Sequence, residues 1–359
     1  MIDIRLSKRD SLPLYKSILI RVIAVVLALL VCAVVIVSVT DLNPLEVYSG
    51  IFKGALGTKR RVWVTIRDTL ALLMVAIGLV PAFKMKFWNI GAEGQLLMGS
   101  LASAALMIYG ANIPNAILLP LIMVCSCLAG VVWGIIPAIF KAKYNTNETL
   151  FTLMMNYIAI QLISFCVVFW ENPAGSNSVG IINPMTNAGW FPVLFGQRYG
   201  LNLVLTVLVA AFMTFYLKYT KHGFELSVVG ESWNTARYSG INVKKVIIRT
   251  MALSGAICGL AGCLVVSGAS HTISTSLGDG RGFTAIIVAW MSDFNTISMV
   301  IVSFFLCFMD NGAIQIASQF GLNENVSDII VGIIIFFLIG STFFTRYKVK
   351  IGREKQSLK

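Results

Sequence analysis

Long apolar runs without a charged residue alternate with short polar segments along the whole chain. Only helices and closed barrels can cross a lipid bilayer, and continuous runs of this length indicate helices instead of barrel strands. One run, Gly94–Phe140, is too long for a single helix and divides at the turn signal Gly110–Pro114. The pattern predicts ten spans: Val22–Thr40, Thr69–Phe83, two within Gly94–Phe140, Thr149–Trp170, Tyr199–Leu217, a seventh from near Ile247 to near Gly268, Phe283–Ser292, Phe294–Met309 and Ile329–Thr345.

The predicted fold class is therefore all-α and integral to the membrane, with about ten transmembrane helices. The two short runs on either side of Asp293 could instead form one broken helix, which would leave nine spans. We expect one transmembrane domain over residues 1–359, with an N-terminal segment at 1–21, the helical bundle at 22–345 and a basic tail at 346–359. No clear cleavage site precedes Asp41, so we expect the first span to be retained.

Composition and charge support a membrane protein with both ends in the cytoplasm. The 359 residues are 57% hydrophobic and only 12% charged, which is outside the range of soluble domains of this size. With the N-terminus inside and ten spans, 21 of the 28 lysines and arginines fall on the inner side. Cytoplasmic segments carry such an excess, so the net charge of +12 is mainly a topology signal. The cations are dispersed among the spans, which argues against a nucleic-acid partner.

The sequence contains no pattern for a metal or nucleotide cofactor. All seven cysteines lie within predicted spans at spacings that do not match a metal site, and we interpret them as small packing residues. The two histidines, His222 and His271, fall in opposite loops. No Gly-x4-Gly-Lys-Ser/Thr phosphate loop occurs, so the chain cannot bind ATP in that way.

A carboxylate is placed inside the membrane by the segment Phe83–Gly99. Glu93 follows Lys86 by seven residues, which puts it roughly 10 Å inside a helix that starts at the membrane edge. An ionisable side chain there costs about 2.5–3.5 kcal/mol on insertion scales. Glu93 either lines a path and bonds a polar solute, or is satisfied within the protein by neighbours or a helix end. The candidate path residues are Asn89, Glu93, Gln95 and Asn156.

The two halves of the chain are predicted to have opposite orientation. Spans one to five start inside and spans six to ten start outside, which is the logic of inverted-repeat transporters. Each half also has a glycine-interrupted polar break beside a short span, at Asn89–Gly99 and at Gly278–Phe283. We therefore expect a 5+5 inverted pseudo-repeat.

The loop at 218–246 contains a short predicted helix. Ser232 is a plausible N-cap and Gly240 a plausible stop, which brackets about two turns. A short surface helix with an exposed Trp233 is typical of a ligand for a groove on a partner protein. The alternative is a helix that lies on lipid headgroups with Trp233 as its anchor.

Two other segments have simpler interpretations. Small residues at 252, 255, 256, 259 and 262 form one face, which predicts close helix packing. The basic segment 41–68 is assigned outside and contains a predicted surface helix at Leu45–Leu56. Its arginines either extend to headgroups or form a docking patch for an acidic outer partner, and the candidates are Arg60, Arg61 and Arg67.

Four blocks of sequence, in order, resemble the permeases of ABC importers of the nucleoside and simple-sugar group. The resemblance is to the longer of that group's two paralogous permeases, and it covers most of residues 40–345. The blocks are Phe87–Gly99, Asn147–Ile158, Gly223–Gly262 and Gly280–Phe283. Trp88 is bulkier than the family pattern suggests, and Thr149–Phe151 replaces a more β-branched run.

The resemblance implies a type II importer fold and a set of partners. These are a paralogous permease, a cytoplasmic ABC ATPase that holds ATP and magnesium, an outer solute-binding protein and membrane lipid. The loop helix would be the coupling helix, with the residues Gly230, Glu231, Trp233, Asn234, Ala236, Arg237 and Gly240. Asn147 and Glu148 would form a second inner contact.

The chain is thus expected to be a non-enzymatic permease of a bacterial cytoplasmic membrane. Nucleosides are the first expected cargo, with simple sugars such as ribose or galactose second. A cation-coupled secondary transporter would usually carry more paired acids and bases within its spans, and a membrane enzyme would need a catalytic cluster that the sequence lacks.

Overall fold

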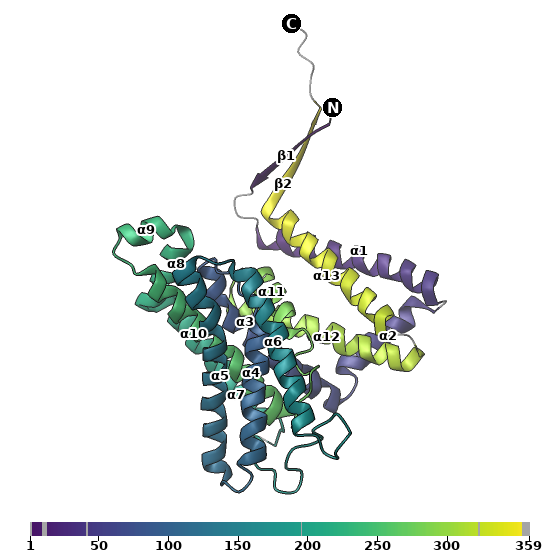
Figure 1. The fold of residues 1–359 in the computed structure, drawn as a ribbon. Helices are drawn as coiled ribbons and strands as arrows, with labels where there is room; N and C mark the ends of the chain where they lie inside the picture. The colour runs from purple at the N-terminus through teal and green to yellow at the C-terminus, as the bar shows by residue number, and fades with distance from the viewer. Residues whose placement is uncertain (1, 9–12, 41, 195, 322–323, 354–359) are drawn as a thin grey trace. The chain divides into compact units, whose positions relative to one another are not determined.

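Helices make up nearly all the regular structure of the chain. A computed structural model describes residues 2–8, 13–40, 42–194, 196–321 and 324–353 (Figure 1). The elements are β1 (Ile2–Lys8), α1 (Leu14–Thr40), α2 (Pro44–Leu56), α3 (Lys59–Lys84), α4 (Ala92–Tyr109), α5 (Asn115–Tyr144), α6 (Glu148–Phe169), α7 (Gly200–Tyr219), α8 (Lys221–Glu231), α9 (Trp233–Tyr238), α10 (Val243–Val265), the π-helical turn η1 (Val266–Ser270), α11 (Arg281–Met291), α12 (Thr296–Phe320), α13 (Glu324–Arg346) and β2 (Tyr347–Arg353).

Seven helices of the described chain are long and apolar enough to cross a membrane. They contain the segments Val22–Thr40, Lys59–Lys84, Asn115–Tyr144, Glu148–Phe169, Gly200–Tyr219, Val243–Ser270 and Thr296–Phe320. Shorter apolar helices follow at Arg281–Met291 and Ile329–Thr345. The chain is therefore a helical, multi-pass membrane protein.

Several helices extend beyond the predicted apolar runs. The helix expected at Thr69–Phe83 begins earlier, at Lys59, and includes the ion pair of Arg67 with Asp68 at 2.8 Å. The two short runs predicted on either side of Asp293 are present as two separate helices, α11 and α12, and the second extends to Phe320. Asp293 and Phe294 between them have φ of 49° and 61°, values that end an α-helix.

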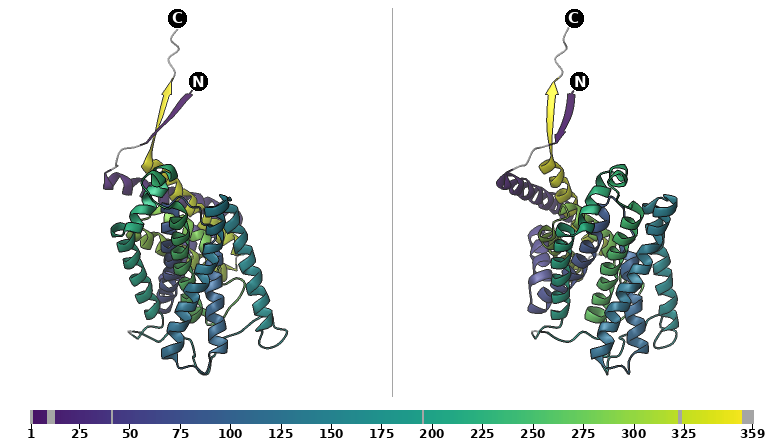
Figure 2. Two further views of the ribbon diagram at one scale, coloured as in Figure 1. Left: turned by 60° about the vertical axis from the view of Figure 1, so that its left-hand side comes forward. Right: turned by 90° about the vertical axis from the view of Figure 1, so that its left-hand side faces the viewer.

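The chain forms two compact units. Unit 1 contains Met1–Thr65 and Phe305–Lys359, and unit 2 contains Ile66–Phe304. In unit 2, α10 packs along both α4 and α5, and the three helices run side by side in each view (Figures 1 and 2).

Glycine sets the close approach of these three helices. A Cβ built on Gly255 would overlap the carbonyl oxygen of Gly130 in α5, and one on Gly259 would overlap that of Ser126. A Cβ on Gly99 in α4 would overlap the backbone of Gly259. The small-residue face predicted in the sequence is confirmed as a surface for close helix packing.

Unit 1 adds a two-stranded sheet to the helices, so the prediction of a purely helical chain was incomplete. β1 pairs antiparallel with β2, with Ile4 opposite Ile351 and Leu6 opposite Val349. Both segments alternate apolar and polar residues with a period of two, which favours a strand over a helix. The sequence interpretation considered only their charge and assigned them as terminal segments.

The predicted surface helix in unit 1 is present as α2. Asn43 caps it, because its side chain accepts the Leu45 N–H at 3.0 Å, and Pro44 occupies the first helical position. Its inner face is buried, and a Cβ on Gly54 would meet the backbone and side chains of α12 residues in the same unit.

Candidate functional site

The loop before α4 carries a buried polar network. The Asn89 side chain is buried, and its amide donates to the Ser254 hydroxyl of α10 at 3.3 Å and to Gln95 Oε1 at 3.5 Å. Its Oδ1 accepts the Gly91 N–H at 3.0 Å. This side chain therefore fixes the loop to both the first turn of α4 and the middle of α10.

Asn156 binds the same loop from the side of α6. Its Oδ1 accepts the Gly94 N–H at 2.8 Å, and its Nδ2 donates to the Ile90 carbonyl at 2.9 Å. The Ile90 N–H donates to the Thr152 hydroxyl one turn earlier in α6. A Cβ on Gly94 would come within 2.9 Å of both Asn156 Oδ1 and the Trp133 ring nitrogen, so this position favours glycine.

Glu93 links the two glycine-interrupted breaks of the chain. Its carboxylate accepts the Gly280 N–H at 3.1 Å and the Gly282 N–H at 2.5 Å, at the start of α11. The side chain is only 5% exposed, and a Cβ on Gly278 would overlap Oε1. A carboxylate at a helix N-terminus satisfies N–H groups that have no partner within the helix. The two polar breaks, 187 or more residues apart in sequence, thus meet at one side chain.

The structure therefore brings the four candidate path residues together around one helix start. Asn89, Gln95 and Asn156 lie on the loop side of α4, and Glu93 lies toward α11. All four are buried within the chain. Their hydrogen bonds are to backbone and side-chain groups of α4, α6, α10 and the start of α11, and these bonds hold the four helices in register.

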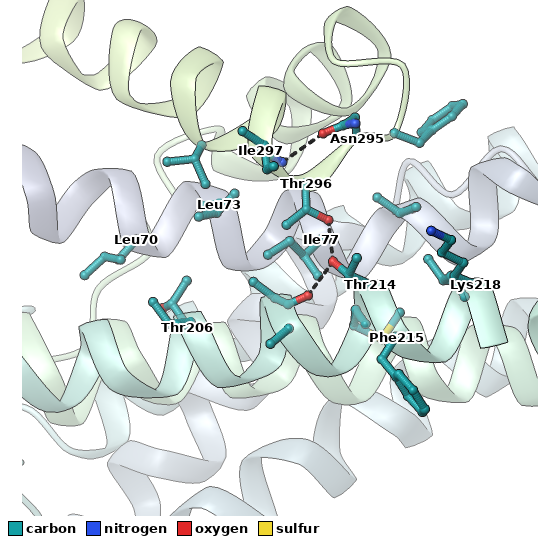
Figure 3. A pocket seen from close by; sticks show the side chains of 18 of the residues that line it. Leu70, Leu73, Ile77, Thr206, Thr214, Phe215, Lys218, Asn295, Thr296 and Ile297 are labelled. Carbon is teal, nitrogen blue, oxygen red and sulfur yellow. Dashed lines mark hydrogen bonds between the residues drawn. The ribbon is translucent and has the colours of Figure 1, made fainter. Parts of the chain in front are cut away.

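A larger groove lies between α3, α7 and the start of α12 (Figure 3). Its volume is about 920 Å³, and most of its walls are Leu, Ile, Val and Ala side chains. The hydroxyls of Thr214 and Thr296 bond each other at 2.8 Å, and Thr206 donates to the Asn202 carbonyl. This groove offers a polar solute few unoccupied hydrogen-bond partners.

The helix predicted in the 218–246 loop is present as α9 with the predicted start and stop. Ser232 Oγ accepts the Thr235 N–H at 3.3 Å, and Gly240 has a φ of 77°. The N–H of Ile241 donates to the Ala236 carbonyl, which closes the C-terminal turn.

The expected exposure of Trp233 was wrong. Trp233 is only partly exposed and packs against a buried apolar cluster that includes Ala236. The Lys141 ammonium lies 5.6 Å from its ring centroid. Tyr238 is the exposed aromatic residue of α9, at 94%. A six-residue helix can bury one face only, and the tryptophan is on that face.

The other coupling candidates divide between exposed and buried positions. Glu231, Asn234, Arg237 and Gly240 are exposed, whereas Gly230 is buried. A Cβ on Gly230 would overlap the Lys84 carbonyl at the end of α3. Gly230 therefore allows α8 to pack on α3, and the exposed residues form the outward surface of the loop.

The second predicted inner contact lies beside the same helix. Asn147 caps α6 by accepting the N–H groups of Thr149 and Leu150, at 3.0 and 3.3 Å. Glu148 forms an ion pair with Lys141 at 2.8 Å, and Lys141 in turn lies over Trp233. Sequence reasoning missed Lys141, although opposite charges on both sides of the turn at Asn145 were a signal for this pair.

The three arginines proposed for outer docking are not equivalent. Arg60 is exposed. Arg61 donates to the Lys53 carbonyl at 2.9 Å and to Gln315 Oε1 at 2.7 Å. Arg67 is paired with Asp68 and lies 5.8 Å from the Tyr199 ring centroid. Arg61 thus joins α2 to α12, and Arg67 lies against Tyr199 at the start of α7, while a role of the three arginines in outer docking stays a prediction.

The described chain has many apolar spans, two glycine breaks joined by a buried carboxylate, and a capped surface helix in a loop. Together these features are typical of a multi-pass membrane transport protein. Residues 64–339 match the family of the branched-chain amino acid transport system permease component. The chain belongs to this family. It is the permease subunit of an ABC importer, in which ATP hydrolysis belongs to a separate subunit and a solute-binding protein takes part.

Comparison with characterised proteins gives similar permeases over almost the full length. The chain is 30% identical over 327 residues to the guanosine ABC transporter permease protein NupP of Bacillus subtilis, covering 90% of this chain and 93% of NupP. It is 25% identical over 332 residues to the nucleoside permease NupB of Lactococcus lactis, covering 90% and 91%. It is 28% identical over 366 residues to the glucose permease TsgB13 of Haloferax volcanii, covering 99% and 96%. No solved structure matches the chain significantly.

Proposed function

We propose that this permease forms the translocation path for purine and pyrimidine nucleosides. The observation that carries the proposal is the repeated similarity to nucleoside systems. Besides NupP and NupB, the chain matches NupQ of Bacillus subtilis and NupC of Lactococcus lactis, over 60% and 65% of its length. NupQ and NupC are named as guanosine and nucleoside permeases. The more extensive match to NupP than to NupQ supports the assignment to the longer of two paralogous permeases.

Simple-sugar import is the second candidate. The similarity to TsgB13, named as a glucose permease, extends over 99% of this chain. A nucleoside contains a sugar, so the two candidates share a hydroxyl-rich solute.

We further propose a type II importer fold with ten spans arranged as a 5+5 inverted repeat. The seven long helices, together with α4, α11 and Ile329–Thr345, make ten apolar segments. The contact between the two glycine breaks supports a repeat, because each break then holds an equivalent place in its half. Both termini would lie in the cytoplasm of a bacterial cell, as the lysine and arginine excess predicts.

The end of the bundle with α8 and α9 would then face the ATPase. The exposed Tyr238 and Arg237 would contact a groove on the ATPase. The ion pair of Lys141 with Glu148 would support α9 through the contact of Lys141 with Trp233. ATP and magnesium would be held by that ATPase, and a paralogous permease would complete the transmembrane pair. Glu93, Asn89, Gln95 and Asn156 would position the helix breaks that border the path.

Uptake measurements test the cargo. Cells with and without the gene are given labelled guanosine, uridine, ribose and glucose. Loss of nucleoside uptake alone is the expected result. Loss of glucose or ribose uptake alone would move the assignment to sugars, and unchanged uptake of all four would refute both candidates.

A further inference from the structure

A second, polar cavity lies between α3, α7, the end of α10 with η1, and the loop before α11. Its volume is about 340 Å³, at the lower end of the range of small-molecule sites. Its lining includes Arg67, Asp68, Asn202, Ser276, Asp279 and Arg281. All of these residues belong to unit 2.

The charges around this cavity are balanced. Asp68 lies between two guanidinium groups, with Arg67 at 2.8 Å and Arg281 at 3.5 Å. Asp279 supplies a second carboxylate to the lining. Two cations and two anions favour neither a cationic nor an anionic ligand. Donors and acceptors set close together instead suit hydroxyl groups, which both donate and accept.

Asn202 lines this cavity and carries a buried acceptor without a partner in the described part of the chain. This side chain is only 2% exposed, and its Nδ2 donates to the Leu264 carbonyl at 3.3 Å. Its Oδ1 has no hydrogen-bond partner in the described part of the chain. A buried acceptor without a partner costs free energy, and native proteins rarely leave one unless something else binds it. Gly268 of η1 lets the Asn202 amide pack against the backbone, because a Cβ there would overlap it.

The cavity lacks a stacking surface for a nucleobase. Its described lining contains no aromatic side chain. Base recognition usually uses aromatic rings or a guanidinium plane, whereas the two guanidiniums here are engaged with Asp68. The lining therefore suits hydroxyls better than a base.

We propose that this cavity is a subsite for the sugar moiety of the transported solute. The ligand class is a neutral ring with neighbouring hydroxyls, and Asn202 Oδ1 and the Asp279 carboxylate accept from those hydroxyls. This assignment rests on the proposed nucleoside import. Two lining residues, Asp279 and Arg281, flank Gly280, whose N–H donates to Glu93. A bound sugar therefore lies next to the contact between the two helix breaks.

The test compares ribonucleosides with their dideoxy forms in the complete importer. The assembled complex is placed in proteoliposomes, and uridine and 2′,3′-dideoxyuridine are supplied at concentrations that saturate the binding protein. We expect Asn202→Ala and Asp279→Ala to lower uridine turnover about fivefold to tenfold, the loss of one hydrogen bond. Dideoxyuridine turnover should not change. Ser274→Ala, in the same loop but outside the lining, is the matched control and should transport both solutes like wild type.

Equal losses for both solutes, or no loss, would overturn the subsite. A second measurement does not depend on transport. In Ser276→Cys, labelling by a membrane-impermeant maleimide should be slowed by ribose and uridine but not by dideoxyuridine, with wild type as the background. Uridine transport without such protection would refute the sugar subsite but not the proposed nucleoside import. Protection by ribose in a complex that transports no nucleoside would refute nucleoside import and leave the sugar subsite standing.

Discussion

Removing the Glu93 side chain should separate the two helix breaks. Its carboxylate satisfies the N–H groups of Gly280 and Gly282 at the start of α11. An unsatisfied buried donor costs about 1–3 kcal/mol, so Glu93→Ala should destabilise the fold by about 2–6 kcal/mol. Folded proteins are stable by about 5–15 kcal/mol in total, so this is a large fraction. Glu93→Gln keeps one acceptor oxygen and turns an NH₂ group toward the other donor, and about half of the loss is expected.

The assay is thermal unfolding of detergent-purified protein, together with uptake in cells. The expected order for both readouts is wild type, Glu93→Gln, then Glu93→Ala. Glu171→Ala is a matched control, because the Glu171 carboxylate also accepts two backbone N–H groups, from Gly175 and Asn177, but in an exposed loop. Water can replace it there, so little change is expected. Equal losses at Glu93 and Glu171, or wild-type behaviour of Glu93→Ala, would refute the reasoning.

Three further results are expected from other parts of the chain. Gly255→Ala should lower the yield of folded protein, because its Cβ overlaps backbone, whereas Gly332→Ala, in open space, should not; equal yields would contradict the packing argument. Tyr238→Ala should reduce solute-stimulated ATP hydrolysis and leave the unfolding temperature unchanged, because Tyr238 is exposed. Trp233→Ala should lower both, because Trp233 packs on a buried cluster. Normal hydrolysis in a Tyr238→Ala complex would refute the proposed contact of Tyr238 with the ATPase. Burial lowers the pKa of His271 from 6.5 to about 4. The unfolded chain then binds more protons between these values, so stability is full above pH 6.5 and falls toward pH 4. His271→Phe should flatten the plot of melting temperature against pH between pH 4 and 6.5. An unchanged slope in that range would show that other groups cause the pH dependence.

The spans were predictable from sequence because they depend on local composition. A run such as Tyr199–Leu217 excludes charge over its full length, and α7 occupies Gly200–Tyr219. The cap at Ser232 and the stop at Gly240 were also local, since each depends on the side chain or the φ of one residue. These features need no information about distant parts of the chain.

The remaining features depend on residues that are distant in sequence. Nothing near Glu93 indicates that Gly282, 189 residues away, would supply its donor. The burial of Trp233 depends on Lys141 and the cluster beneath it, which composition alone does not indicate. The sequence does not indicate that Arg67 pairs with Asp68 and lines the polar cavity, because the direction of this side chain depends on packing.

The β1–β2 ladder joins the first strand of the chain to the last, and this has a consequence for synthesis. Lys8 and Tyr347 are the paired residues that lie nearest to each other in sequence, and almost the entire chain separates them. Ribosomes add about 5–20 residues per second, so β1 waits about 20–70 s for its partner. During that time its backbone donors and acceptors form an open edge, which other nascent chains or quality-control factors can recognise. Closure of this ladder therefore requires that synthesis has passed Arg353.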